Sequence, residues 1–195
     1  MGFHIEGWVV GKKNETITHP MADSRAENWI RILAPFKDKV KSILEVGSYE
    51  GQSALFWLDF FPGVALTCID PWAYYATGAL SALEVEDHFD TNVGKLVTKI
   101  KGNSIPSLYA LSGSKFDLIY IDGDHRRDNV MIDSLLAWPL LNPGGVMIWD
   151  DYATYDPKAK PSRRPQPAID AFLKMKADEL TILENTKEQM FVVKT

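Results

Sequence analysis

Short apolar runs alternate with longer amphipathic segments along most of this chain. The runs that we predict as strands cover residues 43–46, 65–69, 97–100, 116–121 and 146–149. Continuous apolar runs of this length are typical of parallel strands that are covered on both faces. The alternation therefore predicts an α/β fold, in which helices pack on both sides of a mainly parallel sheet.

The segments between these runs carry apolar residues at helical spacing. We predict helices over residues 25–36, 53–61, 81–96, 105–111, 128–138 and 168–177. In the first of them, Trp29, Ile32 and Leu33 form an apolar stripe. We interpret this stripe as packing against the sheet edge rather than as a lid over a substrate.

Three side chains of the later helices give specific expectations for burial. Leu96 and Leu135 continue the apolar stripes of their helices, so both are expected in the core. His88 is surrounded by acidic residues in the sequence and is expected on a solvated face.

The composition is that of a globular protein. Of the 195 residues, 46% are hydrophobic and 24% are charged, so the chain can build one substantial core. We expect a single domain over residues 1–195, with residues 1–41 as an N-terminal helical extension and residues 42–195 as the core. A weak edge-strand pattern over residues 3–10 precedes the first predicted helix.

Charge and cysteine content argue against several classes of partner and site. The net charge of -5 gives no electrostatic reason to expect nucleic acid. Cys68 is the only cysteine, which excludes an intrachain disulfide and a cysteine-based zinc site. No apolar run reaches membrane-spanning length, and residues 1–11 lack the apolar centre of a signal peptide. We therefore expect a cytoplasmic protein without membrane association.

The first predicted strand runs into a glycine turn and then into a helix. The turn reads Glu45-x-Gly47-x-Tyr49-x-Gly51, with an acid two residues before the first glycine. A dinucleotide fingerprint G-x-G-x-x-G would need glycines where Tyr49 and Gln52 stand. A strand, glycine turn and helix start place backbone N–H groups where open α/β proteins bind nucleotide-like ligands. The alternative is a turn that only joins the strand to the helix.

Polar residues also follow the second and third predicted strands. Asp70 ends the second strand about 20 residues after the glycine turn, a position suited to hydrogen bonding with ribose hydroxyls in several nucleotide-binding classes. Trp72 could flank an adenosine or pack in the core. Asn103 and Ser104 follow the third strand, where either could also cap the next helix.

Acidic residues end the fourth and fifth predicted strands. Asp122 ends the fourth, and Asp150 with Asp151 end the fifth, so parallel neighbouring strands would bring the three carboxylates to one rim. Carboxylates this close repel one another unless a positive charge lies between them, and a hard divalent cation is a common solution. His125 would stand at the same rim as a base. The alternative is that these acids only cap helices or lie in loops.

The glycine turn resembles motif I of the class I S-adenosylmethionine-dependent methyltransferases, with Tyr49 in place of the middle glycine of the commonest form. The resemblance implies S-adenosylmethionine along the turn, with the Glu45 carboxylate facing its cationic amino-acid part, the ribose on Asp70 and the adenine beside residues 102–104. The cofactor-binding residues that it implies are Glu45, Gly47, Ser48, Tyr49, Gly51, Ser53, Asp70, Pro71, Trp72, Asn103, Ser104 and Asp122.

From about Trp29 onward, the chain resembles the metal-dependent O-methyltransferases, most closely the branch that contains the macrolide-sugar O-methyltransferases. The resemblance implies that Asp122, Asp150 and Asp151 bind Mg²⁺ or another divalent cation, and that His125 is the general base. Catechol-type relatives have Lys at that position, so a catechol substrate is disfavoured. The fold implied is Rossmann-like and doubly wound, with a mostly parallel seven-stranded sheet and an antiparallel C-terminal hairpin.

We therefore expect Mg²⁺-assisted O-methylation of a small-molecule hydroxyl, with a sugar or glycosylated metabolite as a possible acceptor and a homo-oligomer as an open possibility. Residues 73–80 and 156–167 are expected to select the acceptor. A metal-independent methyltransferase is the nearest alternative. A nicotinamide-dependent oxidoreductase lacks the required glycine spacing, and a non-catalytic binding protein would not need the acids and His125.

Overall fold

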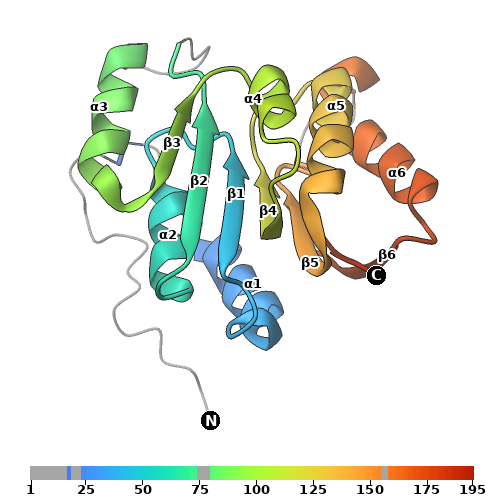
Figure 1. The fold of residues 1–195 in the computed structure, drawn as a ribbon. Helices are drawn as coiled ribbons and strands as arrows, with labels where there is room; N and C mark the ends of the chain where they lie inside the picture. The colour runs from blue at the N-terminus through green and yellow to red at the C-terminus, as the bar shows by residue number, and fades with distance from the viewer. Residues whose placement is uncertain (1–16, 19–22, 74–79, 155–157) are drawn as a thin grey trace.

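Seven strands form one central sheet in the computed structural model, which describes residues 17–18, 23–73, 80–154 and 158–195 (Figure 1). The strands are β1 (Ser42–Val46), β2 (Ala65–Asp70), β3 (Thr98–Lys101), β4 (Phe116–Ile121), β5 (Leu141–Trp149), β6 (Leu180–Asn185) and β7 (Met190–Lys194). Their order across the sheet is β3-β2-β1-β4-β5-β7-β6. The predicted run over residues 3–10 lies outside the described residues.

The strand directions confirm the predicted fold class. β1 pairs in parallel with β2 and β4, and the parallel pairing continues to β3 and β5 at either side. β7 then pairs antiparallel with both β5 and β6. The chain therefore folds as a doubly wound, mostly parallel sheet that ends in an antiparallel hairpin.

Helices cover both faces of the sheet, as the apolar runs predict. The α-helices are α1 (Asp23–Leu33), α2 (Gln52–Phe60), α3 (Ala82–Asn92), α4 (Ser104–Ala110), α5 (Arg127–Ala137) and α6 (Gln166–Met175). Alternate residues of the strands point to opposite faces. In β4, Leu118 and Tyr120 join the core under α1, α2 and α3, whereas Ile119 and Ile121 join the core under α4, α5 and α6 (Figure 1).

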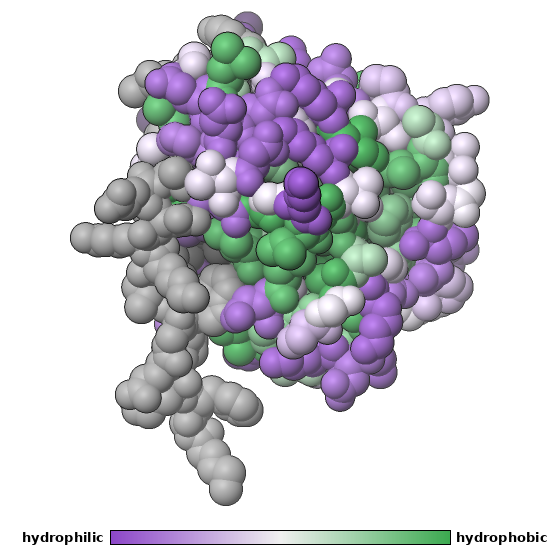
Figure 2. Space-filling view, turned by 60° about the vertical axis from the view of Figure 1, so that its left-hand side comes forward, coloured by the Kyte–Doolittle hydropathy of each residue, from purple (hydrophilic) through white to green (hydrophobic). Residues whose placement is uncertain are grey.

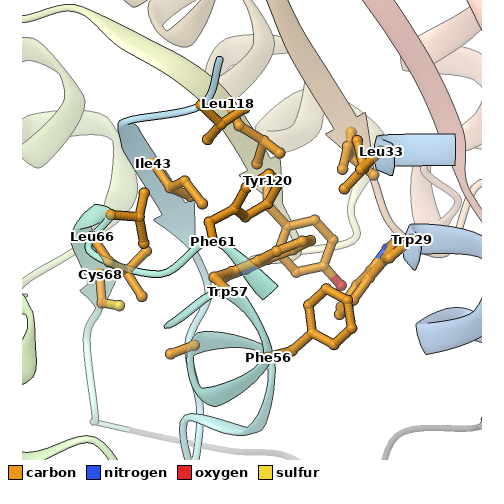
Figure 3. Packing of buried hydrophobic residues seen from close by; sticks show 14 of the residues in the cluster. Trp29, Leu33, Ile43, Phe56, Trp57, Phe61, Leu66, Cys68, Leu118 and Tyr120 are labelled. Carbon is orange, nitrogen blue, oxygen red and sulfur yellow. The ribbon is translucent and has the colours of Figure 1, made fainter. Parts of the chain in front are cut away.

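An aromatic cluster fixes α1 and α2 on the sheet (Figure 3). The ring of Trp29 lies 4.3 Å from that of Trp57 and 5.4 Å from that of Tyr120, measured between ring centroids. Phe56 packs on the edge of Trp29 at 4.8 Å. Such pairs each stabilise a fold by about 0.5–1.5 kcal/mol beyond the area they bury. The predicted stripe of α1, which includes Trp29, is confirmed as core.

Two of the predicted core residues are instead exposed. Leu96 is 69% exposed, because α3 ends at Asn92 and Gly94, with a φ of 57°, turns the chain out of the helix. Leu135 is 42% exposed, because Val130 and Ala137 form the buried side of α5. The prediction was wrong at both positions, since apolar spacing alone does not say where a helix ends or how it is rotated.

The face in Figure 2 shows a hydrophobic area framed by hydrophilic side chains. Large hydrophobic side chains that are exposed in the described chain include those of Leu83, Leu96, Tyr109 and Met175. Among the described residues, the helices are too short or too polar to cross a membrane.

Replacing Gly47 by alanine should destabilise the fold by roughly 2–5 kcal/mol, the sum of the cost of a left-handed backbone and of overpacking. Gly47 has a φ of 89°, and a Cβ atom there would lie 2.1 Å from the Asp122 carbonyl oxygen. Gly63→Ala is the matched control, because Gly63 has a φ of 78° but open space around it. Urea unfolding of both variants tests this, and equal losses of stability would contradict the close approach at Gly47.

Candidate active site

A cleft of about 1300 Å³ lies at the carboxyl ends of the parallel strands. The predicted site residues that line it are Gly47, Ser48, Tyr49, Ser53, Asp70, Pro71, Asn103, Ser104, Asp122, His125, Asp150 and Asp151. Ligand sites of open α/β sheets occur at this edge. Three residues that the sequence also predicted in the site do not line the cleft but lie behind the residues that do: Glu45, Gly51 and Trp72.

The glycine turn needs its glycines for different reasons. At Gly47 the turn passes directly over the backbone of Asp122, so that the end of β1 touches the end of β4. At Gly51, which has a φ of 84°, a Cβ atom would lie 2.5 Å from a methyl group of Val93. Tyr49 also has a positive φ, 47°, although it carries a side chain.

The carboxylate of Asp70 holds this turn in place. Its Oδ2 accepts hydrogen bonds from the backbone N–H groups of Ser48 and Tyr49, each at 3.0 Å, and its Oδ1 accepts one from Trp72 at 2.8 Å. Asp70 is only 3% exposed, so without it these donors would lose their partner in a buried place. The structure therefore gives Asp70 a positioning role, and its contact with a ribose stays a prediction.

Trp72 packs rather than lining the cleft. Its indole N–H donates to the carbonyl of Tyr49 at 2.9 Å, its ring lies 4.7 Å from that of Phe89, and only 2% of the residue is exposed. Of the two interpretations that the sequence left open, the structure favours packing.

Glu45 lies beneath the turn and is fully buried. It accepts a hydrogen bond from the Ser53 hydroxyl at 2.6 Å, and burial raises the pKa of its carboxyl group to about 8. Among the described residues, Glu45 Oε2 and the buried hydroxyl of Ser48 make no well-formed hydrogen bond, although the Ser48 hydroxyl lies close enough to Glu45 to lower the pKa of its carboxyl group. Buried polar atoms without partners in a protein structure point to a ligand or water that completes them.

Asn103 stands at the N-terminal cap of α4, and Ser104 is the first residue of that helix. In the described chain, the Asn103 side chain makes no capping hydrogen bond, although it lines the cleft. This favours the interpretation of Asn103 as a cleft residue over that of a cap.

Glu50, which the sequence motifs do not single out, connects three parts of the chain beside the turn. Its carboxylate accepts hydrogen bonds from the N–H and hydroxyl of Thr18, each at 2.8 Å, and lies 2.9 Å from Nδ1 of His88. The expectation of a solvated His88 was therefore wrong, because its ring pairs with a side chain that is 1% exposed. These partners come from distant parts of the sequence, so helical spacing could not reveal them.

The acids at the ends of β4 and β5 do converge, as predicted. The ring of His125 lies between two of them, with Nε2 3.2 Å from Oδ1 of Asp122 and Nδ1 3.2 Å from Oδ2 of Asp151. Asp122 also accepts a hydrogen bond from the buried Tyr120 hydroxyl at 3.0 Å, and Asp150 accepts one from Gln189 at 2.7 Å. We call Asp122, Asp150 and Asp151 the carboxylate rim.

Arg25 contacts the carboxylate rim, although the sequence did not indicate it as a site residue. Its guanidinium group spans two carboxylates, with Nη1 2.8 Å from Oδ2 of Asp150 and Nη2 2.8 Å from Oδ1 of Asp151. Arg25 lies on α1, 126 residues before Asp151 in the sequence, and its side chain is 23% exposed. The only sequence signal for it was a basic residue one turn before Trp29 on a helix with an apolar stripe.

The sequence matches the family described as "Methyltransferase domain" over residues 44–152, which is more than half of the chain and includes both the glycine turn and the carboxylate rim. The chain belongs to this family. The match confirms the methyltransferase resemblance that the motifs indicated.

Individual relatives are distant. The O-methyltransferase ankF of Aspergillus thermomutatus is 23% identical over 113 residues, which cover 58% of this chain and 46% of ankF, so the methyltransferase domain described here corresponds to less than half of that relative. Among solved structures, the O-methyltransferase NovP has a TM-score of 0.70 at 16% identity, covering 91% of this chain and 82% of NovP. MycE, from the mycinamycin biosynthetic pathway and solved in complex with Mg and SAH, has a TM-score of 0.63 at 19% identity, covering 86% of this chain and 48% of MycE.

Charge is nearly balanced at the rim of this methyltransferase. Burial raises the pKa of Asp150 well above its usual range, and the neighbouring Asp122 adds to this, although Arg25 opposes it. For His125, burial lowers the pKa, but the hydrogen bond and charge of Asp122 together with Asp151 outweigh it and raise the value to about 9. His125 is thus held as an imidazolium while the rim keeps this arrangement.

The chemistry and the position of the carboxylate rim suit a divalent cation, since three carboxylates lie at one edge of the cleft of the methyltransferase. Among the described residues, however, no three acidic, histidine or cysteine side chains are arranged to ligate one ion. Arg25 and His125 lie between the acids and contact the oxygens that would be ligands.

In EDTA, we expect the free energy of unfolding of the methyltransferase to fall as pH rises from 6.5 to 9. The folded-state pKa of His125 is about 9, above the ordinary value of 6.5, so its stabilising charge is fully present below pH 6.5 and is lost as pH rises through 9. The loss is at most about 3 kcal/mol for a shift of this size.

Urea unfolding across this pH range, compared with the His125→Gln variant, measures the effect. Glu45, whose raised pKa also lowers stability as pH rises toward 8, is present in both proteins, so the difference between them isolates His125. Parallel pH profiles for the two proteins would show that His125 is not held charged at the rim.

Proposed function

We propose that the protein transfers the methyl group of S-adenosylmethionine to a hydroxyl oxygen of a small molecule, with a sugar hydroxyl as the favoured acceptor and a divalent cation as helper. One observation carries this proposal: the glycine turn and the carboxylate rim share one cleft, because Gly47 passes over the backbone of Asp122. A methyl donor on the turn and a hydroxyl at the rim would therefore be neighbours.

The residues of the turn fit a ligand with a cationic amino-acid part and a nucleoside. Ser48 lines the cleft where β1 finishes, and Glu45 lies directly behind that lining; Glu45 Oε2 and the Ser48 hydroxyl are buried without a well-formed hydrogen bond among the described residues. Asp70, Pro71 and Asn103 line the same cleft at the ends of β2 and β3. S-adenosylmethionine is a substrate here, and it leaves as S-adenosylhomocysteine after the C–S bond to the methyl group breaks.

At the other end of the cleft, Asp122, Asp150 and Asp151 would hold the divalent cation. When bound, such an ion lowers the pKa of a hydroxyl group beside it. His125 lies within hydrogen-bond distance of Asp122 and would first lose one proton to solvent once a ring nitrogen is released from its carboxylate. The neutral ring would then take the hydroxyl proton on that nitrogen. The oxygen then forms its bond to the methyl carbon, and the proton stays on His125 until solvent removes it.

Two alternatives differ in chemistry. A metal-independent methyltransferase would use His125 with Arg25 in place of the ion, and the contacts of Arg25 with Asp150 and Asp151 favour this as the second candidate. A nicotinamide-dependent oxidoreductase is disfavoured, because a pyrophosphate needs the glycine that Tyr49 replaces.

Calorimetric titration of S-adenosylhomocysteine into the protein, with Mg²⁺ or with EDTA, tests the proposed cofactor. We expect micromolar binding in both conditions, because the turn, not the rim, supplies most contacts. NAD is the matched control and should give no heat. Absence of S-adenosylhomocysteine binding in both conditions would exclude the proposed function.

Removal of His125 should slow methyl transfer without weakening the cofactor site. His125→Ala is expected to lower the rate on a panel of sugars and vicinal diols by a factor of about 10²–10⁴, the usual contribution of a general base. S-adenosylhomocysteine affinity should stay within about twofold, because His125 lies at the rim and not on the turn. Full activity of the variant would remove His125 from the mechanism.

A further inference from the structure

Every oxygen of the carboxylate rim already has a partner within the protein. The partners are Tyr120 and His125 for Asp122, Gln189 and Arg25 for Asp150, and Arg25 and His125 for Asp151, all at 2.7–3.2 Å. A divalent cation at the rim must therefore displace some of these groups, since Mg²⁺ binds the oxygen lone pairs directly at about 2.0–2.1 Å.

Arg25 is the partner that conflicts most with such an ion. It is always charged, so it repels a second cation, and it contacts both acids at the end of β5 at once. Tyr120 and Gln189 are neutral, and each contacts only one oxygen, of Asp122 and Asp150 respectively, so neither of them repels a cation.

The position of Arg25 is built into the fold. Arg25 lies four residues before Trp29 on α1, on the same side of the helix, and Trp29 is completely buried against Trp57 and Tyr120. The aromatic cluster therefore aims the guanidinium group at the rim. Arg31, six residues further along α1, makes instead an exposed ion pair with Glu184 at 2.6 Å.

We propose that Arg25 is an internal counter-ion that competes with the divalent cation for Asp150 and Asp151, and thereby sets the metal affinity of the site. The proposal rests on the assignment of these acids as metal ligands in the proposed function. Arg25 keeps the acids together when no metal is bound, and it has to withdraw when metal binds.

The structure offers a place for the displaced guanidinium group. Glu188 lines the same cleft, and its carboxylate lies 3.3 Å from the hydroxyl of Ser24, the residue next to Arg25. An acid beside the start of α1 can receive the positive charge without leaving it unpaired.

The first test measures metal binding itself, with Mn²⁺ detected by electron paramagnetic resonance. We expect Arg25→Gln to bind Mn²⁺ at least about tenfold more tightly than the unaltered protein, because a charge-assisted contact no longer has to be broken. Arg31→Gln, from the same helix, is the control and should bind Mn²⁺ as the unaltered protein does. Unchanged or weaker binding by Arg25→Gln would overturn the proposal.

The second test separates competition from a merely structural role. In EDTA, Arg25→Gln should melt at a lower temperature than the unaltered protein, and addition of Mg²⁺ should raise its melting temperature by more. If Arg25 only supported the fold, the variant would melt lower by the same amount with and without Mg²⁺, and the proposal would fail.

Arg25→Lys provides the same measurements should Arg25→Gln not fold, because a single ammonium group cannot span two carboxylates in the bidentate way of a guanidinium group. We expect a smaller gain in Mn²⁺ affinity in the same direction, and no gain would contradict the proposal. Titration with S-adenosylhomocysteine separates the two proposals. If the unaltered protein does not bind S-adenosylhomocysteine, the proposed function fails. If it binds S-adenosylhomocysteine but the variants show unchanged Mn²⁺ affinity, only the role of Arg25 fails.

Discussion

The contact between the backbones of Gly47 and Asp122 is the constraint on which the site depends. The N–H group of Asp122 donates to the carbonyl of Val46 at 2.8 Å, and the N–H group of Gly47 donates to Ile69 of the neighbouring strand at the same distance. The ends of β1, β2 and β4 are thereby joined at one point. No side chain fits between Gly47 and Asp122, so the turn and the rim are fixed relative to each other by the main chain.

Around this point, burial decides the form of the polar network. Carboxylates in a place that water reaches poorly are costly unless each finds a donor or a positive charge. Asp70 meets this requirement with backbone N–H groups, Glu50 with Thr18 and His88, and Asp150 with Arg25 and Gln189. Glu45 meets it only in part, and burial raises its pKa accordingly. The acids therefore differ in role because they differ in their partners.

The sequence predicted the elements well and their long-range contacts poorly. The parallel strands followed from apolar runs, the hairpin from the family resemblance, and the acids at the rim from where β4 and β5 end. The strands and the acids need only local patterns together with the rule that parallel strands end at one edge. The roles of Arg25 and Glu50 were not predicted, because a charged residue on a helix or in a turn has the same local sequence pattern whether it faces solvent or a buried partner. Their partners are 126 and 38 residues away, and only the packed fold brings them together.

The aromatic cluster under α1 has a consequence for how the site can change. Arg25 and Trp29 share one side of α1, so the seating of a tryptophan in the core determines where a positive charge stands in the cleft. Sliding α1 by a single turn would carry that charge about 5 Å along the helix axis, which is more than an ion pair can span. The position of a positive charge in the cleft thus depends on hydrophobic packing outside the cleft. A methyltransferase of this kind could be retuned by substitutions that never touch a ligand.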